Sequence, residues 1–180
     1  MMNEIGLGSP SASLKVYIQN RPPLIEYDEL SSTKPMRVGE IAEIAQLTGN
    51  HWRKIFNVYA KLCFEINPLT FNRWQQYRDE LLLQNHSPHA LLFSPPPHSL
   101  VALKNQCHET THINIIMGKT YASELLKLTT KNAITLHWLD EHFAINKNLR
   151  LIVCPYFDYR QLSNIKITKL VALIKSLQLK

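Results

Sequence analysis

The sequence predicts a three-layer α/β/α fold with a mainly parallel, four-stranded central sheet, and three observations support this class. One alternating segment and three short apolar runs have the length of strands, and helical segments separate them along the chain. Runs this apolar are typical of strands that are covered on both faces, as in a parallel sheet between helices. The length of 180 residues suits one domain, so we expect a single domain with residues 1–12 as a candidate disordered tail.

The first half of the chain predicts one strand and three helices. Residues 14–18 alternate and are rich in β-branched and aromatic side chains, which predicts a strand that ends before Pro22 and Pro23. Apolar residues at helical spacing predict helices over 38–47, 52–64 and 71–83. The second of these has the most regular apolar stripe in the chain.

The second half of the chain predicts three further strands. They are the apolar runs 90–93, 113–117 and 149–154, each bounded by Gly or Pro. Helices are expected over 119–126 and 165–179. A weaker segment over 134–138 is expected to be a strand or the start of a helix.

Composition excludes several classes of protein. A hydrophobic content of 45% argues against a disordered chain, and no apolar stretch is long enough for a membrane helix. The first ten residues lack the pattern of a secretory signal. The three cysteines, Cys63, Cys107 and Cys154, are far apart and odd in number, so we expect buried reduced thiols in a cytoplasmic protein.

The net charge of +6 is concentrated at the C-terminal end. From residue 147 onward there are seven basic residues and one acid, while the rest of the chain is neutral. A basic segment on a neutral body favours an anionic partner, with nucleic acid as the usual candidate. The alternative is a solvated basic helix that has no partner.

Ligands of parallel α/β sheets bind beyond the carboxyl ends of the strands. For the four predicted strands, these positions are residues 19–23, 94–98, 118–120 and 155–159. We therefore expect a binding site where these four segments meet.

The same segments carry a resemblance to a known family. The first strand leads into Gln19, Asn20 and a Pro pair, the second ends at Ser94, and the third ends at Gly118 before a helix with an early Ala. The last strand leads into a loop that starts at Pro155. In order and spacing, residues 14–178 resemble the uracil-DNA glycosylase-like superfamily.

The resemblance implies that Asn20 positions a water, and that an active enzyme of this kind would be a DNA glycosylase-like hydrolase. Aromatic side chains after the last strand would stack on bases, and basic ones would hold phosphates. The candidate binding residues are Gln19, Arg21, Ser94, Gly118, Lys119, Tyr156, Phe157, Tyr159, Arg160 and Lys166. The alternative for Tyr156 and Phe157 is simple packing.

The sequence departs from the family pattern at three places. The first loop has no acid, Ser94 stands where the family has an Asn, and the last loop has Cys-Pro-Tyr-Phe in place of His-Pro-Ser. An Asn is a poor general base because its amide does not usefully accept a proton. Whether the chain is an enzyme is therefore open.

Two other functions are compatible with the sequence. Residues 41–58 partly match a helix-turn-helix, which would make the chain a DNA-binding regulator. A non-enzymatic interaction or assembly module is the other alternative. We expect no metal and no cofactor, because His108 and His112 lie in a polar loop and Gly118-Lys119-Thr120 lacks the earlier Gly of a phosphate loop.

Overall fold

The computed structural model describes residues 4–68, 71–96, 112–128 and 134–178. In these residues, one mixed sheet of eight strands combines with six helices, which confirms the α/β class. The strands are β1 (Gly6–Gly8), β2 (Leu14–Tyr17), β3 (Thr33–Lys34), β4 (His89–Leu92), β5 (Ile113–Met117), β6 (His137–Trp138), β7 (Ala144–Asn146) and β8 (Leu151–Cys154). The helices are α1 (Ile25–Asp28), α2 (Glu40–Thr48), α3 (Asn50–Ile66), α4 (Trp74–Glu80), α6 (Lys119–Leu128) and α7 (Asn164–Gln178).

The strand order is β3-β1-β4-β2-β5-β8-β7-β6. The four predicted strands are neighbours at its centre, where β4, β2, β5 and β8 pair in parallel. The prediction of a mainly parallel four-stranded sheet is nevertheless wrong, because four short strands extend the sheet at both flanks. Three of the added pairings are antiparallel, β1 with β4, β6 with β7 and β7 with β8.

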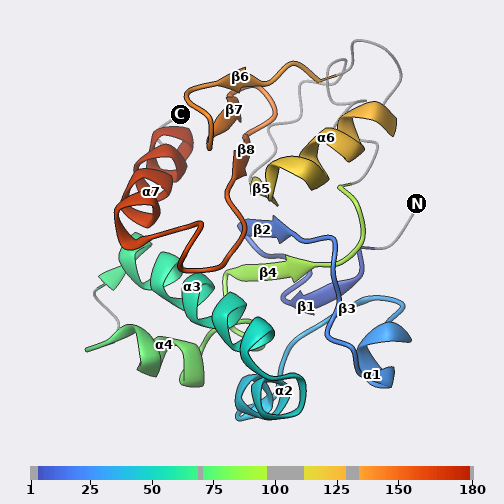
Figure 1. The fold of residues 1–180 in the computed structure, drawn as a ribbon. Helices are drawn as coiled ribbons and strands as arrows, with labels where there is room; N and C mark the ends of the chain where they lie inside the picture. Colours follow the sequence, from blue (N-terminus) through green and yellow to red (C-terminus); the bar gives the residue numbers. More distant parts are fainter. Residues whose placement is uncertain (1–3, 69–70, 97–111, 129–133, 179–180) are drawn as a thin grey trace.

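One face of the sheet is covered by α3 and α7, with α2 and α4 beside them (Figure 1). Alternate strand residues such as Val16, Ile115 and Ile152 point into this larger core. The stripe predicted on α3 supplies its other side, with the fully buried Phe56 and Tyr59. Burial of this wide face holds α3 against the sheet, while its polar residues lie on the outer side.

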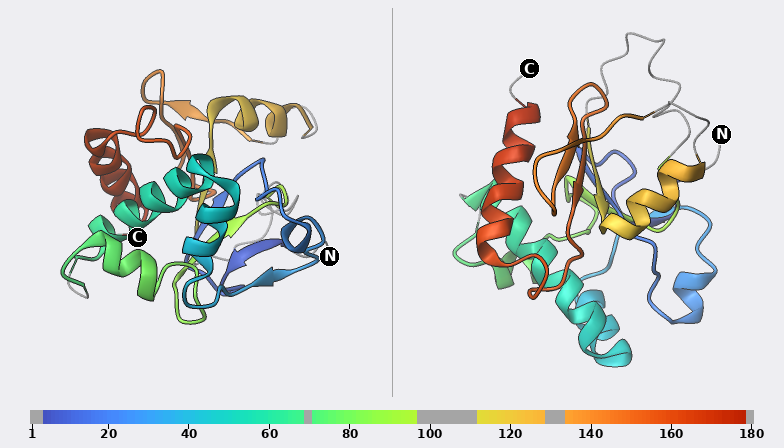
Figure 2. Two further views of the ribbon diagram at one scale, coloured as in Figure 1. Left: turned by 60° about the horizontal axis from the view of Figure 1, so that its bottom comes forward. Right: turned by 45° about the horizontal axis from the view of Figure 1, so that its top comes forward.

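The opposite face is covered by α6 in the described residues (Figure 2). The intervening strand residues, among them Tyr17, Ile116 and Val153, pack there with Tyr121 and Ala122 of α6. The strands therefore contribute side chains to two separate cores, as expected for predominantly apolar runs that are covered on both faces.

The N-terminal residues differ from the expected tail. β1 lies between β3 and β4, and its Leu7 is fully buried. Gly6 is required there, because a Cβ atom would lie 2.2 Å from the carbonyl oxygen of Leu91. From Glu4 onward, the described N-terminal residues therefore pair with the sheet or contact it, and they do not form a tail.

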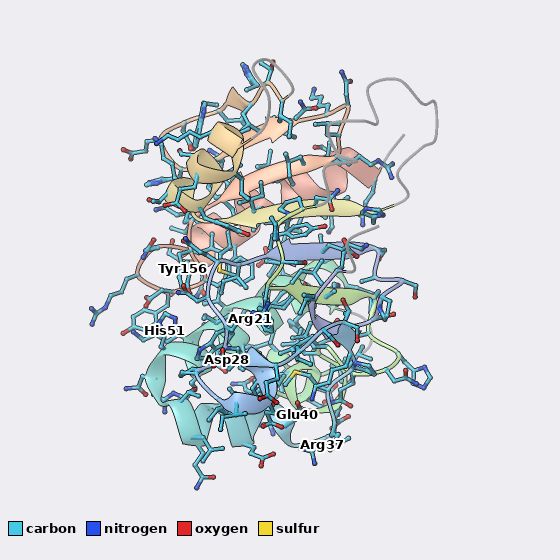
Figure 3. All side chains as sticks on the ribbon, turned by 90° about the vertical axis from the view of Figure 1, so that its right-hand side faces the viewer. Arg21, Asp28, Arg37, Glu40, His51 and Tyr156 are labelled. Carbon is cyan, nitrogen blue, oxygen red and sulfur yellow. The ribbon has the colours of Figure 1, made fainter. Side chains whose placement is uncertain are left out.

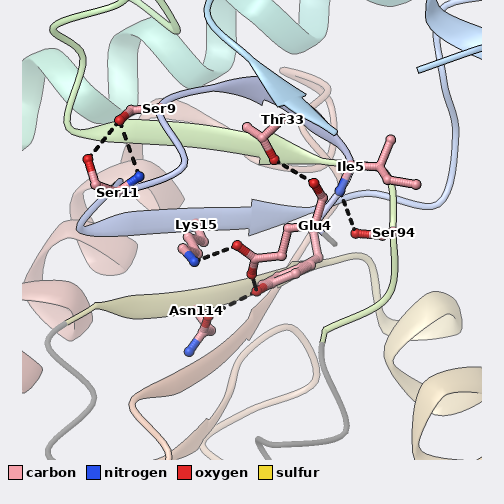
Figure 4. Close-up of polar contacts among 9 residues, drawn as sticks. Glu4, Ile5, Ser9, Ser11, Lys15, Thr33, Ser94 and Asn114 are labelled. Atoms are coloured by element: carbon pink, nitrogen blue, oxygen red, sulfur yellow. Dashed lines mark hydrogen bonds and ion pairs between the residues drawn. The ribbon is translucent and has the colours of Figure 1, made fainter. Parts of the chain in front are cut away.

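A polar cluster joins this N-terminal segment to the centre of the sheet (Figure 4). Glu4 accepts hydrogen bonds from Lys15 Nζ at 2.6 Å and Tyr17 Oη at 2.9 Å. Tyr17 Oη is also 3.3 Å from Asn114 Oδ1, on the fully buried side chain of Asn114. Burial raises the pKa of Tyr17, with Glu4 as a second cause, so this phenol stays protonated.

The buried cysteines agree with the expected reduced thiols. Cys63 and Cys154 are both free and buried, and burial raises the pKa of each thiol. Cys107 lies outside the described residues. None of the described helices is long and apolar enough to cross a membrane.

Candidate functional site

The carboxyl ends of the four parallel strands open onto one edge of the sheet, which we call the carboxyl edge. It is formed by the segments after β2 (residues 19–21), β4 (93–94), β5 (118–119) and β8 (155–160), with the start of α3 beside them. Parallel pairing from β4 to β8 places these segments next to one another. The edge is therefore the first place to look for bound ligands.

Three side chains from three elements meet there, as Figure 3 shows for His51 and Tyr156. Asn20 Nδ2 donates to Tyr156 Oη at 3.4 Å, and the same oxygen is 3.1 Å from Nε2 of His51. The rings of His51 and Tyr156 are 5.8 Å apart, and Tyr156 is half-buried while His51 and Asn20 are exposed. Burial raises the pKa of Tyr156, so its hydroxyl is a neutral donor and acceptor.

Gly118 lies beside this group. It has a φ of 98°, and a Cβ atom there would be 3.8 Å from Cδ2 of Tyr156, an ordinary contact distance. Its amide donates to the carbonyl of Cys154 at 2.9 Å, which ties the end of β5 to the end of β8. Gly118 and Tyr156 are thus brought together as predicted.

Gln19 and Arg21 point away from the group on opposite sides. Gln19 Nε2 donates to Glu124 of α6 at 2.9 Å. Arg21 donates to the carbonyl oxygens of Tyr27 and Asp28 at 3.2 and 3.0 Å, and its guanidinium lies 5.9 Å from the ring centre of Phe93. Arg21 therefore holds the loop between β2 and α1 rather than facing the edge.

Two further predicted residues are already used by the fold. Ser94 Oγ accepts a hydrogen bond from the amide of Ile5 at 3.0 Å, which fixes the N-terminal segment to the end of β4. Lys119 Nζ lies 4.6 Å from the ring centre of Trp138 on β6. Neither residue contacts Tyr156 in the described structure.

The loop after β8 divides its aromatic residues between core and surface. Phe157 is fully buried and packs on Tyr59 at 5.5 Å, so it is a core residue and offers no face to a ligand. Tyr159 is 53% exposed. The outward Tyr159 is therefore the aromatic residue of this loop that is most open to a stacking partner.

Two cations lie over the ring of the exposed Tyr159. Lys54 Nζ is 4.9 Å and Arg160 Cζ is 5.8 Å from its centre. Asp158 forms an ion pair with Lys54 at 3.2 Å and accepts a hydrogen bond from the amide of Arg160 at 2.9 Å. The hydrogen bond from this amide is the main cause of the lowered pKa of Asp158. Asp158 therefore offsets one of the two positive charges.

In the described residues, the basic side chains of the C-terminal segment are spread over several elements. Arg160 and Lys166 lie after β8, and Lys166 donates to the carbonyl of Gln161 at 3.0 Å. Lys169 hydrogen-bonds to Asp140, and Lys175 lies near the far end of α7. The predicted concentration of charge in the sequence is thus spread along β8 and α7.

His51 and Lys54 were not predicted to lie at the carboxyl edge, because they belong to a helix whose strongest signal is its apolar stripe. Both lie in the first two turns of α3, which begins directly after Gly49. No local motif marks them, and their partners are more than 100 residues away in the chain.

The described residues contain no group of three His, Cys, Asp or Glu side chains that could hold a metal ion.

The helices of the helix-turn-helix alternative are present as α2 and α3. They are joined at Gly49, which has a φ of 79°. Trp52, Ile55 and Phe56, at the start of α3, are buried against the core. Arg53 is exposed and lines a hollow of about 290 Å³ between α2, α3 and α4.

Comparison with known proteins gives a family but no function. No curated protein and no solved structure matches the chain. A family model does match, over residues 5–175, and its description is a family of unknown function, DUF6942. This match corrects the resemblance to the uracil-DNA glycosylase-like superfamily, which rested on strand order and spacing and lacked that family's loop residues. The chain belongs to DUF6942, a family of unknown function.

Proposed function

We propose that the carboxyl edge binds single-stranded nucleic acid, with bases on its aromatic side chains and phosphates on its basic ones. The observation that carries the proposal is Tyr159, more than half exposed and bordered by Lys54 and Arg160. An exposed aromatic ring next to guanidinium and ammonium groups offers both kinds of contact that a nucleotide needs.

Tyr156 and His51 extend this surface inward. Their rings are 5.8 Å apart and join the loop after β8 to the start of α3. Base stacking on an aromatic side chain contributes roughly 1–3 kcal/mol and tolerates any sequence. The proposal is therefore binding with weak sequence preference, and it includes no chemical step.

The test is a titration of a fluorescently labelled 20-mer of oligothymidine, followed by anisotropy at 50 and 200 mM salt. We expect saturable binding at the lower salt and weaker binding at the higher, because phosphate contacts release counterions. Tyr159→Ala should weaken binding by about 5- to 100-fold, the range set by loss of one stacked base. Arg160→Ala should weaken it and reduce the log–log salt slope by about 0.7, the value of one phosphate contact on a single strand.

Lys175→Ala is the matched control, because this lysine is exposed but lies near the far end of α7, whereas Arg160 lies in the loop before that helix. It should leave binding within about twofold. Absence of binding at 50 mM salt, or equal losses from Arg160→Ala and Lys175→Ala, would rule out the proposed surface.

A duplex of mixed sequence in the same assay separates this proposal from the regulator alternative. Arg53 is the exposed basic residue at the start of α3, where a recognition helix would contact the duplex. Preference for duplex together with a loss on Arg53→Ala would favour the regulator. Preference for the single strand, unchanged by Arg53→Ala, would favour the carboxyl edge.

A further inference from the structure

A second site lies at the opposite edge of the sheet, where the parallel strands begin. A cavity of about 200 Å³ opens there between the sheet and the helices α3, α4 and α7. Its buried walls come from the first residues of three strands and from one residue of each helix: Leu14, His89, Ile113, Cys63, Tyr77 and Ile174. It is distinct from the carboxyl edge and independent of the proposed function.

The cavity is lined by one buried pair of hydrogen-bonded side chains, Tyr77 and His89. Tyr77 Oη is 2.8 Å from His89 Nδ1, and the two side chains are 3% and 6% exposed. In the described part of the chain, no hydrogen bond is made by the other ring nitrogen, Nε2 of His89. Nε2 is not itself fully buried, so it is open to a hydrogen-bonding group of a ligand in the cavity.

The lining excludes charged ligands. Among its twelve described lining residues there is no Asp, Glu, Lys or Arg. Burial lowers the pKa of His89 to about 4, so its imidazole is neutral at pH 7. An ion would lose its hydration without gaining a counter-charge, whereas an apolar body would pack on Leu14, Ile113 and Ile174.

The size of the cavity points to one ring. An enclosed apolar cavity of about 150 Å³ holds a benzene molecule; this cavity is somewhat larger, with buried apolar walls and the exposed polar residues Ser13, Asn67 and Gln178 in its lining. A hydroxyl group both donates and accepts, so it pairs with Nε2 of His89 whichever ring nitrogen carries the proton. We propose that this cavity binds a small, uncharged, single-ring aromatic molecule that carries one hydroxyl group, with the hydroxyl on His89.

The test uses p-cresol as the probe and isothermal titration calorimetry on the full chain. We expect saturable 1:1 binding, with toluene at least threefold weaker and 4-methylbenzoate at least a hundredfold weaker. His89→Leu should remove the preference for p-cresol over toluene, because both probes then meet an apolar wall. Failure of p-cresol to saturate, equal affinity for 4-methylbenzoate, or an unchanged preference in His89→Leu would overturn the proposal.

Filling the cavity gives an independent check of the location. Ile174→Phe adds volume at the buried wall of α7 and should weaken p-cresol binding at least tenfold. Ile165→Phe, on the same helix but 84% exposed, is the control and should leave binding unchanged. If circular dichroism shows that Ile174→Phe does not fold, Leu81→Phe at the half-buried rim replaces it. Full binding in a folded cavity-filling variant would place the ligand elsewhere and overturn the assignment.

Discussion

Tyr156 Oη lies 3.1 Å from Nε2 of His51, and this contact joins the loop after β8 to the first turn of α3 across 105 residues of sequence. The hydroxyl also accepts from Asn20 at 3.4 Å, so one phenol connects three elements at the carboxyl edge. The ring and the hydroxyl of Tyr156 have different roles in the proposed binding of a single strand, and two substitutions separate them.

Tyr156→Phe keeps the ring and removes the hydroxyl. We expect it to bind the labelled oligothymidine within about twofold of wild type, because stacking depends on the ring. Its free energy of unfolding should fall by about 1 kcal/mol, the usual net value of a hydrogen bond. Tyr156→Ala should weaken binding by about 5- to 100-fold. Equal binding by the two variants would remove Tyr156 from the binding surface.

The central strands could be predicted from sequence, and among the flanking ones only β6 falls within an expected segment, 134–138, where the strand and the helix start were both left open. β2, β4, β5 and β8 are buried at every position and rich in apolar residues, with one polar residue each in β2, β4 and β5, which leaves a visible run in the sequence. β1, β3 and β7 have only three, two and three residues. So short a strand has no periodicity, and its pairing is decided by tertiary contacts.

The residues of the candidate site could likewise be predicted only in part from the sequence. The strand-end rule located Asn20, Gly118 and Tyr156, because parallel pairing alone places strand ends together. It could not separate Tyr156 from Phe157, since adjacent residues point to opposite sides and only the fold determines which side is the core. Nor could it identify His51, whose approach to Tyr156 depends on how α3 crosses the sheet.

Glu40 is the most buried carboxylate of the described structure, and its removal should be costly (Figure 3). It accepts from Tyr27 Oη and from the amide of Arg37, each at 2.8 Å, so it holds α1 to the start of α2. Glu40→Ala should lower the free energy of unfolding by about 2–4 kcal/mol, because the buried hydroxyl of Tyr27 and the part-buried amide of Arg37 both lose their partner. Urea denaturation measures this change.

Glu43→Ala is the control for Glu40, because Glu43 lies one turn later, is exposed and pairs with the exposed Arg37 at 3.4 Å. It should change stability by less than about 0.5 kcal/mol. A double-mutant cycle of Glu40→Ala with Tyr27→Phe should give a coupling energy of about 1–3 kcal/mol. Additive effects of the two changes would show that the hydrogen bond between these side chains contributes nothing to stability.

His89 makes stability depend on pH. Burial lowers its pKa to about 4, compared with 6.5 for the unperturbed group. The unfolded chain therefore binds a proton between pH 6.5 and 4 that the folded chain does not, so stability is full above pH 6.5 and falls as the pH decreases toward 4. The slope from this group is up to about 1.4 kcal/mol per pH unit, for a total loss of about 3 kcal/mol.

His89→Gln should flatten the curve of unfolding free energy against pH in the window from 6.5 to 4, whatever its effect at pH 7. His86→Gln is the control, because His86 is exposed near the same strand. An unchanged slope in His89→Gln would mean that His89 is protonated in the folded protein, and would also remove the neutral imidazole on which the cavity ligand depends.

Asp140 should affect the stability of the fold at a lower pH than His89 does. Its pKa is lowered to about 2, first by the hydrogen bond from Lys169 and then by the amides of His142 and Phe143. The stability contribution of this carboxylate is therefore present above about pH 4, and it is lost as the pH falls through 2. Asp140→Asn should lower the melting temperature at pH 7, and its difference from wild type should shrink between pH 4 and 2.

Lys169 provides the companion test of the same ion pair. It lies 5.3 Å from the ring centre of Phe143 and hydrogen-bonds to Asp140, so its charge is already paired within the fold. Lys169→Met should reduce stability at pH 7 in the same direction as Asp140→Asn, and the double variant should lose little more than either single one. Because the paired charge is not offered to a phosphate, Lys169→Met should also leave oligothymidine binding within about twofold. A loss as large as that of Arg160→Ala would mean that basic residues along α7, rather than the carboxyl edge, hold the nucleic acid.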